Sequence, residues 1–284
     1  MFDSQELAAF IENLTAAVPT NRLGCPGSEG QPVWDRPLIG YAAGDDPLFA
    51  FFKQDIGDFY WLPAEAFAIK YPAISPGHLS VLSLAFPHTE GTRREQRAND
   101  LEPGPRWRYS RKHWPEFMAE VAAGITACLA TQDIRAVTPE LLPEWHWQQS
   151  ARYGYASNWS QRHTAYAAGL GTFGLSDGLI TSAGKAVRFL SLVIEADIPA
   201  TPRTYQTHQE WCPFLQDGSC GVCISRCPAG AITAAGHDKP ACAAYGAAIS
   251  RKYLTEGEGT AGCGLCQTGV PCEFQRPDRA GRIV

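Results

Sequence analysis

Apolar residues recur every three or four positions in two stretches of the chain, which is the spacing of one face of a helix. Leu7, Phe10, Ile11 and Leu14 predict a helix close to the N-terminus. A longer helix further along the chain is predicted by a second set of apolar residues: Trp114, Phe117, Met118, Val121, Ile125 and Leu129. The first turn of this second helix accommodates Pro115.

Three segments have the pattern of strands. Residues 78–86 alternate well enough to predict a half-buried strand, closed by Pro87, while residues 134–137 and 190–194 are shorter apolar candidates. A third helix is expected to begin after Ser160 and to end at Gly169. Beyond the opening helix, the first eighty residues carry many Pro and Gly breakers, and we expect irregular structure there. Because strands and helices alternate through about residue 200, the predicted class is a layered α+β fold.

The composition changes near residue 203. Residues 200–204 are polar and contain proline, which is typical of a linker, and the chain beyond them is rich in Cys, Gly and Ala in short loops. We therefore predict a larger domain over residues 1–203 and a small domain over residues 204–284.

The overall balance of 45% hydrophobic and 19% charged residues is that of a globular protein. We find neither a membrane span nor a secretory signal and expect a cytoplasmic protein without a membrane partner. The net charge of -5 argues against a broad nucleic-acid surface, and tRNA is not expected as a partner. One basic run is the candidate for such a surface and is expected to be ordinary solvated surface: Arg93, Arg94, Arg97, Arg106, Arg108, Arg111 and Lys112.

Cysteine is concentrated in the small predicted domain, which holds eight of the 10 cysteines. In a reducing compartment, clustered cysteines bind metal more often than they form disulfides. The segment contains the pattern C-x2-C-x3-C-P, formed by Cys220, Cys223, Cys227 and Pro228. This pattern is most of the bacterial ferredoxin run that binds [4Fe–4S] clusters. The missing first cysteine is replaced by Cys212, since the intervening loop is long enough to fold back.

Pairing as in two-cluster ferredoxins assigns all eight cysteines to two four-ligand sets with none left over. We call them the first and the second cysteine set. The first set is Cys212, Cys220, Cys223 and Cys272, and the second is Cys227, Cys242, Cys263 and Cys266. Two zinc sites or disulfides are the alternatives, but zinc-ribbon pairs usually lie roughly 15–20 residues apart, and zinc gives no reason for Pro228.

A glycine-rich motif lies in the larger predicted domain. From Arg162, a predicted helix leads into Gly169, Gly171 and Gly174, which form a G-x-G-x-x-G pattern. A dinucleotide-binding fingerprint needs a strand before the glycines and a helix after them, whereas here a helix comes first and a turn follows. From the residues alone, the glycines indicate a helix C-cap followed by a tight packing turn.

The order of these motifs resembles the epoxyqueuosine reductase family, which is related to the reductive dehalogenases. The likeness covers roughly residues 78–275. It implies a larger domain similar to flavin nitroreductases, a ferredoxin-like small domain with two [4Fe–4S] clusters, and a cobalamin to which the clusters pass electrons. The cofactor contacts that the resemblance implies are Gly169, Leu170, Gly171, Gly174, Ile180 and Thr181.

The resemblance also implies two catalytic residues. Seven residues before Arg162, where the family has a proton-donating Asp, this chain has Tyr155. Reductive dehalogenases are similar in using a Tyr as proton donor, so we expect this role for Tyr155. Arg162 is expected to position the substrate or to support ionisation of the donor. His163 follows Arg162 on a predicted helix and is therefore expected to point about 100° away, toward different surroundings.

Three functions are open at this stage. The first is a cobalamin- and iron–sulfur-dependent reductase of a small molecule that takes electrons from a redox donor protein. The second is an electron carrier with two clusters and no corrinoid. The third is a tRNA-modifying enzyme, for which the basic run would have to form an accessible face.

Overall fold

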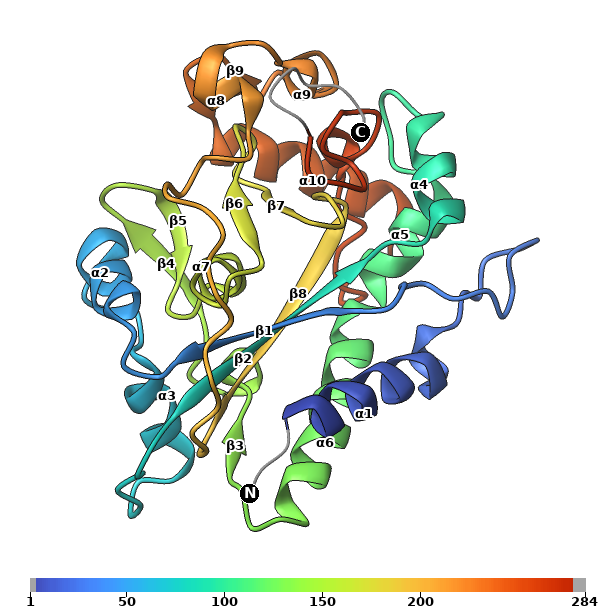
Figure 1. The fold of residues 1–284 in the computed structure, drawn as a ribbon. Helices are drawn as coiled ribbons and strands as arrows, with labels where there is room; N and C mark the ends of the chain where they lie inside the picture. Colours follow the sequence, from blue (N-terminus) through green and yellow to red (C-terminus); the bar gives the residue numbers. More distant parts are fainter. Residues whose placement is uncertain (1–3, 278–284) are drawn as a thin grey trace.

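The computed structural model describes residues 4–277 and has a mixed α+β architecture, as predicted (Figure 1). Its centre is a four-stranded antiparallel sheet in the order β1-β2-β8-β3. The strands are β1 (Leu38–Ala43), β2 (Ser80–Pro87), β8 (Val187–Ile194) and β3 (Ala136–Val137). Helices cover both faces of this sheet.

Every residue of β2 is buried, which corrects the half-buried strand predicted for this segment. Alternate side chains enter two different layers: Leu82 and Leu84 join one apolar cluster, and Val81 joins the other. The strand pairs with β8 along its whole length, from Ser80 opposite Ile194 onward. Alternation suggested a solvated face, but helices on both sides of the sheet exclude water from it.

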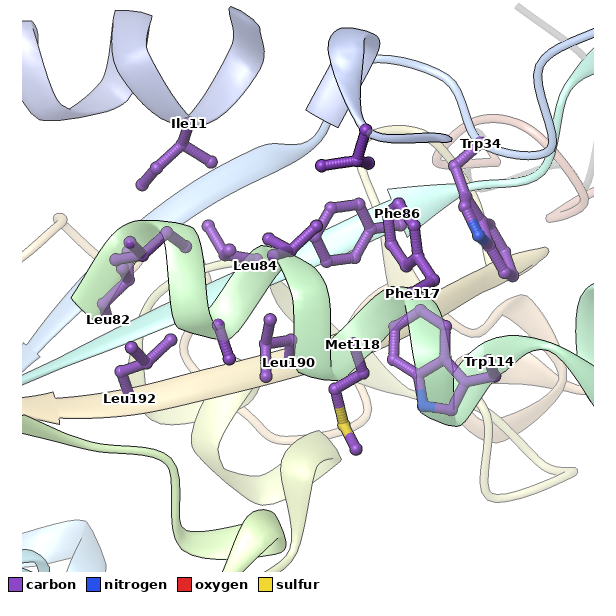
Figure 2. Close-up of a cluster of buried hydrophobic side chains, with 14 of the residues drawn as sticks. Ile11, Trp34, Leu82, Leu84, Phe86, Trp114, Phe117, Met118, Leu190 and Leu192 are labelled. Carbon is purple, nitrogen blue, oxygen red and sulfur yellow. The ribbon is translucent and has the colours of Figure 1, made fainter. Parts of the chain in front are cut away.

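Two predicted helices, α1 (Ser4–Ala17) and α6 (Trp114–Ala130), cover one face of the sheet. Figure 2 shows Phe117 and Met118 of α6 against Leu84 and Leu190 of the central strands, with Ile11 of α1 above them. Phe117 is fully buried. The helical spacing of apolar residues therefore identified the elements that build this half of the core.

The opposite face carries α2 (Pro47–Ile56), α3 (Pro63–Lys70) and α7 (Gln161–Ala167) around an aromatic cluster. The indole of Trp159 stacks on Phe49 and on Tyr60, with ring centroids 6.2 and 6.3 Å apart. The expectation of irregular structure in this part of the chain is therefore wrong. Of the prolines taken as breakers, Pro47 is a first-turn residue of α2, and Pro63 likewise begins α3, a position at which proline favours a helix.

Two short helices and two hairpins connect these layers. The helices are α4 (Glu90–Arg97) and α5 (Pro105–Lys112). One hairpin pairs β4 (Trp147–Ser150) with β5 (Gly154–Ser157), and the other pairs β6 (Gly171–Phe173) with β7 (Leu179–Thr181). Single 3₁₀ turns lie at η1 (Pro19–Asn21), η2 (Pro139–Leu141) and η3 (Leu265–Gln267).

The cysteine-rich segment lies at one end of the sheet, beside α4 and α5 (Figure 1). It contains α8 (Pro213–Asp217), α9 (Val222–Ser225), the short pair β9 (Ile232–Thr233) and β10 (Gly236–His237), and α10 (Lys239–Tyr253). The sequence predicted only short loops here, and this prediction is wrong for α10, which is a helix of 15 residues.

Residues 200–204 have no regular structure, in keeping with a linker, and they are held against the edge of β1. The amide of Thr201 donates to the carbonyl of Tyr41 at 2.9 Å, and Thr201 Oγ1 accepts from the Tyr41 amide at 2.9 Å. The division into domains at residue 203 stays a prediction. Among the described residues, no helix combines the length and apolar character needed to cross a membrane.

Candidate functional site: two cysteine sets beside a cavity

The first cysteine set surrounds a small hollow. Cys212 precedes α8, Cys220 and Cys223 flank the start of α9, and Cys272 follows η3, yet all four line the same hollow. Burial raises the pKa of Cys223 to about 11, and the neighbouring thiols of Cys272, Cys266 and Cys212 add to this rise. The structure therefore brings the four members of this set together.

The second cysteine set forms a separate group next to the first. Burial raises the pKa of Cys263 to about 12, and the thiols of Cys266, Cys242 and Cys227 raise it further. The pKa of Cys266 is likewise raised, first by burial and also by Cys242 and Cys227. The two sets adjoin each other, because Cys266 also acts on Cys223 of the first set.

The two cysteine sets have the number and type of ligands that cubane clusters use. Within residues 4–277, no three His, Cys, Asp or Glu side chains are arranged to hold one metal ion. In a [4Fe–4S] cluster each thiolate binds a different iron, so four cysteines surround an inorganic core instead of meeting at a point. Two groups of four cysteines, all free of disulfides, have the composition that two such clusters require.

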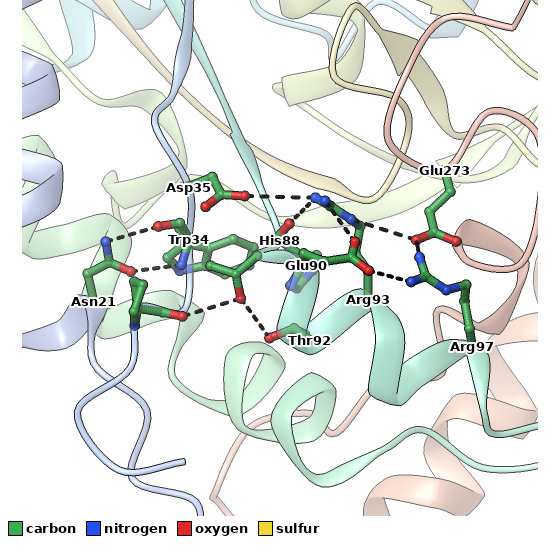
Figure 3. Close-up of polar contacts among 11 residues, drawn as sticks. Asn21, Trp34, Asp35, His88, Glu90, Thr92, Arg93, Arg97 and Glu273 are labelled. Atoms are coloured by element: carbon green, nitrogen blue, oxygen red, sulfur yellow. Dashed lines mark hydrogen bonds and ion pairs between the residues drawn. The ribbon is translucent and has the colours of Figure 1, made fainter. Parts of the chain in front are cut away.

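The position of Cys272 is fixed by its neighbours in the fold. The backbone amide of Lys185 donates to the Cys272 carbonyl at 2.8 Å, and the amide of Ala186 donates to the Glu273 carbonyl at 3.0 Å. The Glu273 side chain is 2% exposed and forms ion pairs with Arg93 and Arg97 of α4 (Figure 3). The start of β8 and α4 therefore hold the last cysteine of the first set in place.

These ion pairs also correct the interpretation of the basic run. Arg93 pairs with Glu90, Asp35 and Glu273 and is only 12% exposed in its side chain. Most of the run faces the rest of the protein instead of forming a solvated face. The further contacts are Arg97 with Glu273, Arg106 with Glu95, Lys112 with Glu258, and Arg108 over the ring of Tyr253.

A cavity of about 360 Å³ lies beside the first cysteine set. Its walls come from α2, from the β4–β5 hairpin, from the first turns of α7, and from the start of α10. Gly174 lines both this cavity and the hollow between the cysteines, so one residue separates the two spaces. Three exposed aromatic side chains stand among its lining residues: Phe51, Trp147 and Tyr155.

Both predicted catalytic residues line the cavity. Tyr155 lies on β5 and is 47% exposed. Arg162 lies on α7 and donates to the carbonyl of Asp177. The expectation that His163 faces other surroundings is wrong, because the cavity extends around the first turns of α7 and His163 lines it too. Burial lowers the pKa of His163 to about 3, so this imidazole is neutral at physiological pH.

The charged residues of the cavity lining are three cations, Arg152, Arg162 and Lys239, and two acids, Asp55 and Asp177. Asp55 forms an ion pair with Arg152 and accepts a hydrogen bond from Tyr153. Asp177 pairs with His237 at 3.0 Å. Lys239 donates to the carbonyl of Tyr155 at 3.4 Å and stands 5.0 Å from the ring of Tyr153. The lining thus carries an excess of positive charge.

His237 connects the cavity to the second cysteine set. Its hydrogen bond with Asp177, followed by one with Cys242, raises the pKa of His237 to about 9. Asp177, Lys239 and His237 were not identified from the sequence, because they come together only through long-range folding. The one local signal was the turn at Asp177, whose φ of 56° lies in the left-handed region.

The six residues named from the resemblance as cofactor contacts have mixed surroundings. Gly174 lines the cavity. A Cβ added at Gly171 would collide with the carbonyl of Ile180, and one at Gly169 would lie 3.2 Å from Thr201, so both glycines permit close backbone packing. The other members of the group are buried: Leu170, Ile180 and Thr181.

Comparison with solved structures finds proteins with a similar fold. A catabolic reductive dehalogenase in complex with 3-bromo-4-hydroxybenzoic acid has a TM-score of 0.52 and 13% identity, over 98% of this chain and 37% of that chain. The chain shares its fold with this reductive dehalogenase. An epoxyqueuosine reductase from Bacillus subtilis has a TM-score of 0.47 and 17% identity, over 85% of this chain and 65% of that one.

A second epoxyqueuosine reductase structure, with an epoxyqueuosine-modified tRNA stem loop, has a TM-score of 0.49 and 16% identity, over 98% and 68% of the two chains. The dehalogenase, whose fold this chain shares, belongs to the group to which the family named from the motifs is related. No protein-family model and no curated protein matches the sequence. The chain spans about a third of the dehalogenase and about two thirds of the Bacillus subtilis reductase.

Proposed function

We propose that this protein is an iron–sulfur oxidoreductase in which two [4Fe–4S] clusters deliver electrons to a small molecule bound in the cavity. The first cluster is held by Cys212, Cys220, Cys223 and Cys272, and the second by Cys227, Cys242, Cys263 and Cys266. The observation that carries the proposal is that Gly174 lines both the hollow of the first set and the cavity. An electron leaving the first cluster therefore has a short path to a bound substrate.

The two parts of the chain would have separate roles. A redox donor protein supplies single electrons to the ferredoxin-like segment after residue 203, and the nitroreductase-like part before it binds the substrate. Each reduction consumes two electrons and two protons. Tyr155, which is exposed to solvent, supplies one proton from its hydroxyl; water supplies the second proton and reprotonates Tyr155, and Arg162 positions the substrate. The excess positive charge, with Lys239 at its centre, favours an anionic substrate.

The resemblance adds a cobalamin beside the cavity. A volume of about 360 Å³ encloses less than a corrinoid, but Phe51, Trp147 and Tyr155 are 54%, 58% and 47% exposed. A broad apolar ligand would cover these aromatic side chains, and exposed apolar patches commonly mark such sites. The residues present therefore fit a corrinoid that extends beyond the cavity, with Gly174 on its inner side. When bound, it would supply a strongly reducing metal centre.

A tRNA substrate is not proposed. Most residues of the basic run already pair with acids or aromatic rings of this chain, which leaves few cations for a phosphate backbone. The ligand of the dehalogenase structure, 3-bromo-4-hydroxybenzoic acid, and the positive charge of the cavity lining instead support a small aromatic anion as substrate. Binding of a tRNA stem loop at physiological salt would contradict this part of the proposal.

One anaerobic preparation tests the proposal. Iron, sulfide and cobalt are measured per chain, and added cobalamin is followed by its absorption spectrum. About eight irons and eight sulfides are expected, with cobalamin bound in the base-off form. Cys223→Ser should lose about half the iron, whereas Cys25→Ser and Cys128→Ser, outside both sets, should lose none. Full iron without cobalamin uptake would favour an electron carrier, and a zinc-loaded or colourless protein would overturn the proposal.

A further inference from the structure

Lys185 is a buried cation without an acidic partner. It lies two residues before β8 and is only 3% exposed. Its Nζ donates to Ser176 Oγ at 3.1 Å. Across residues 4–277, no carboxylate forms an ion pair with it. Burial disfavours its charged form, and the groups that favour the charged form are the cysteine side chains of Cys272, Cys266, Cys223 and Cys212.

The backbone fixes this side chain beside the first cysteine set. Lys185 lines the hollow together with Cys212, Cys220, Cys223 and Cys272. Its own amide donates to the Cys272 carbonyl at 2.8 Å, so the backbones of the lysine and of the last cysteine of the set are held next to each other. Neither partner can move far from the other without breaking this contact.

An ammonium group in such surroundings needs a compensating negative charge, because burying an unpaired ion costs several kcal/mol. The nearest buried acid on this side, Glu273, already pairs with Arg93 and Arg97. Neutral thiols would not supply the charge, whereas four thiolates around a cubane core carry about -2 in total. The lysine and a cluster would therefore neutralise each other in part.

We propose that Lys185 tunes the cluster of the first cysteine set by stabilising its reduced, more negative form. This inference rests on the proposed function, since it requires that the cluster be present. On reduction the cluster gains one electron and one unit of negative charge, and no bond is broken. A fixed positive charge in a dry environment favours that state, and so raises the reduction potential.

The test is a redox titration followed by electron paramagnetic resonance on anaerobic, fully loaded protein. Lys185→Met keeps the length of the side chain and removes its charge, and Lys185→Arg keeps the charge. Lys252→Met is the matched control, because Lys252 is an exposed lysine that pairs with Glu102. In Lys185→Met we expect one reduction step to become at least tenfold less favourable, which is about 59 mV for a one-electron couple.

The second step should not move in Lys185→Met, and neither step should move in Lys185→Arg or Lys252→Met. If Lys185→Met loses one cluster and Lys185→Arg keeps both, the inference is also supported, because the main difference between the two variants is the charge. Unchanged potentials at full iron content, or loss of iron in both variants, would overturn it. A wild-type protein without about eight irons would instead refute the proposed function itself.

Discussion

Different interactions stabilise the central sheet and the cysteine-rich segment. Helix α6 buries seven of its side chains in the core, whereas the 15-residue helix α10 buries only Ile249. The contacts from the cysteine-rich segment to α4 and α5 are mainly ionic, as in Arg97 with Glu273 and Lys112 with Glu258. Apolar burial thus dominates the stability of the sheet, whereas we expect the segment after residue 203 to depend on the proposed clusters and on these ion pairs.

Removal of the metal should separate the two regions most clearly. A chelator under reducing conditions should abolish amide protection between residues 212 and 272, whereas Cys223→Ser should abolish it only around the first cysteine set, because the short helices and loops that carry the cysteines are expected to need the bound metal. Protection of β2 and β8 should persist, as hydrogen exchange with mass spectrometry would show. Cys128→Ser is the control. Retention of full protection in metal-free protein would refute the comparison.

A substitution in the sheet core should have the opposite pattern. Phe117→Ala removes a fully buried ring and is expected to cost about 3–5 kcal/mol of unfolding free energy. Both regions should then unfold together in a denaturant titration, because the cysteine-rich segment is anchored on this part of the fold. Leu101→Ala, at a residue 68% exposed, should change the free energy by less than about 0.5 kcal/mol. Equal effects of the two substitutions would show that the core has been misassigned.

Glu273→Gln tests the ionic anchor between the regions. The change leaves Arg93 and Arg97 without their buried partner, and we expect a loss of about 1–3 kcal/mol. The loss should be accompanied by faster release of iron from the first cysteine set, measured by chelator competition, because Glu273 follows Cys272. Glu102→Gln, in an exposed pair with Lys252, should leave iron release unchanged. Identical release rates in the two variants would contradict the anchoring role.

The smallest expected effect concerns Tyr153, where the two regions meet. Burial, and then the hydrogen bond to Asp55, raises the pKa of Tyr153 to about 12. Because the folded pKa lies above the unfolded value near 10, the contribution of this phenol to stability is present below pH 10 and is lost as the pH rises toward 12. Ultraviolet titration of wild type against Tyr153→Phe should show one late phenol. Asp55→Asn should shift it to lower pH, and an unchanged titration in that variant would contradict the assignment.

Periodicity predicted the fold where burial is one-sided and regular. Helices α1 and α6 followed from the spacing of their apolar residues, because each presents its buried face at a fixed period. Strand β8 followed instead from a continuous apolar run, since it is buried on both faces. Prolines misled the prediction, since Pro47 and Pro63 begin helices instead of ending them. Helix α10 was missed because its Ala-rich sequence has no apolar stripe, and its structure comes from its place in the cysteine-rich segment.

The candidate site was predictable to the extent that it is local in sequence. Cysteine spacing predicted two sets of four thiols, and the structure places Cys212, Cys220, Cys223 and Cys272 around one hollow, while their assignment as cluster ligands stays a prediction. Lys185, Lys239 and Asp177 carried no such spacing. Each gains its surroundings from distant segments, so only the folded chain shows that one cation faces the thiols and another faces the cavity.

The pairing of Cys272 and Glu273 with Lys185, Ala186 and α4 has a consequence for biosynthesis. The first cysteine set gains its fourth member, and that member its anchor, only after residue 273 has left the ribosome. The sheet residues, by contrast, are all translated by residue 194. Inorganic sulfur and iron would therefore be inserted into a chain whose scaffold has already folded, as a late maturation step.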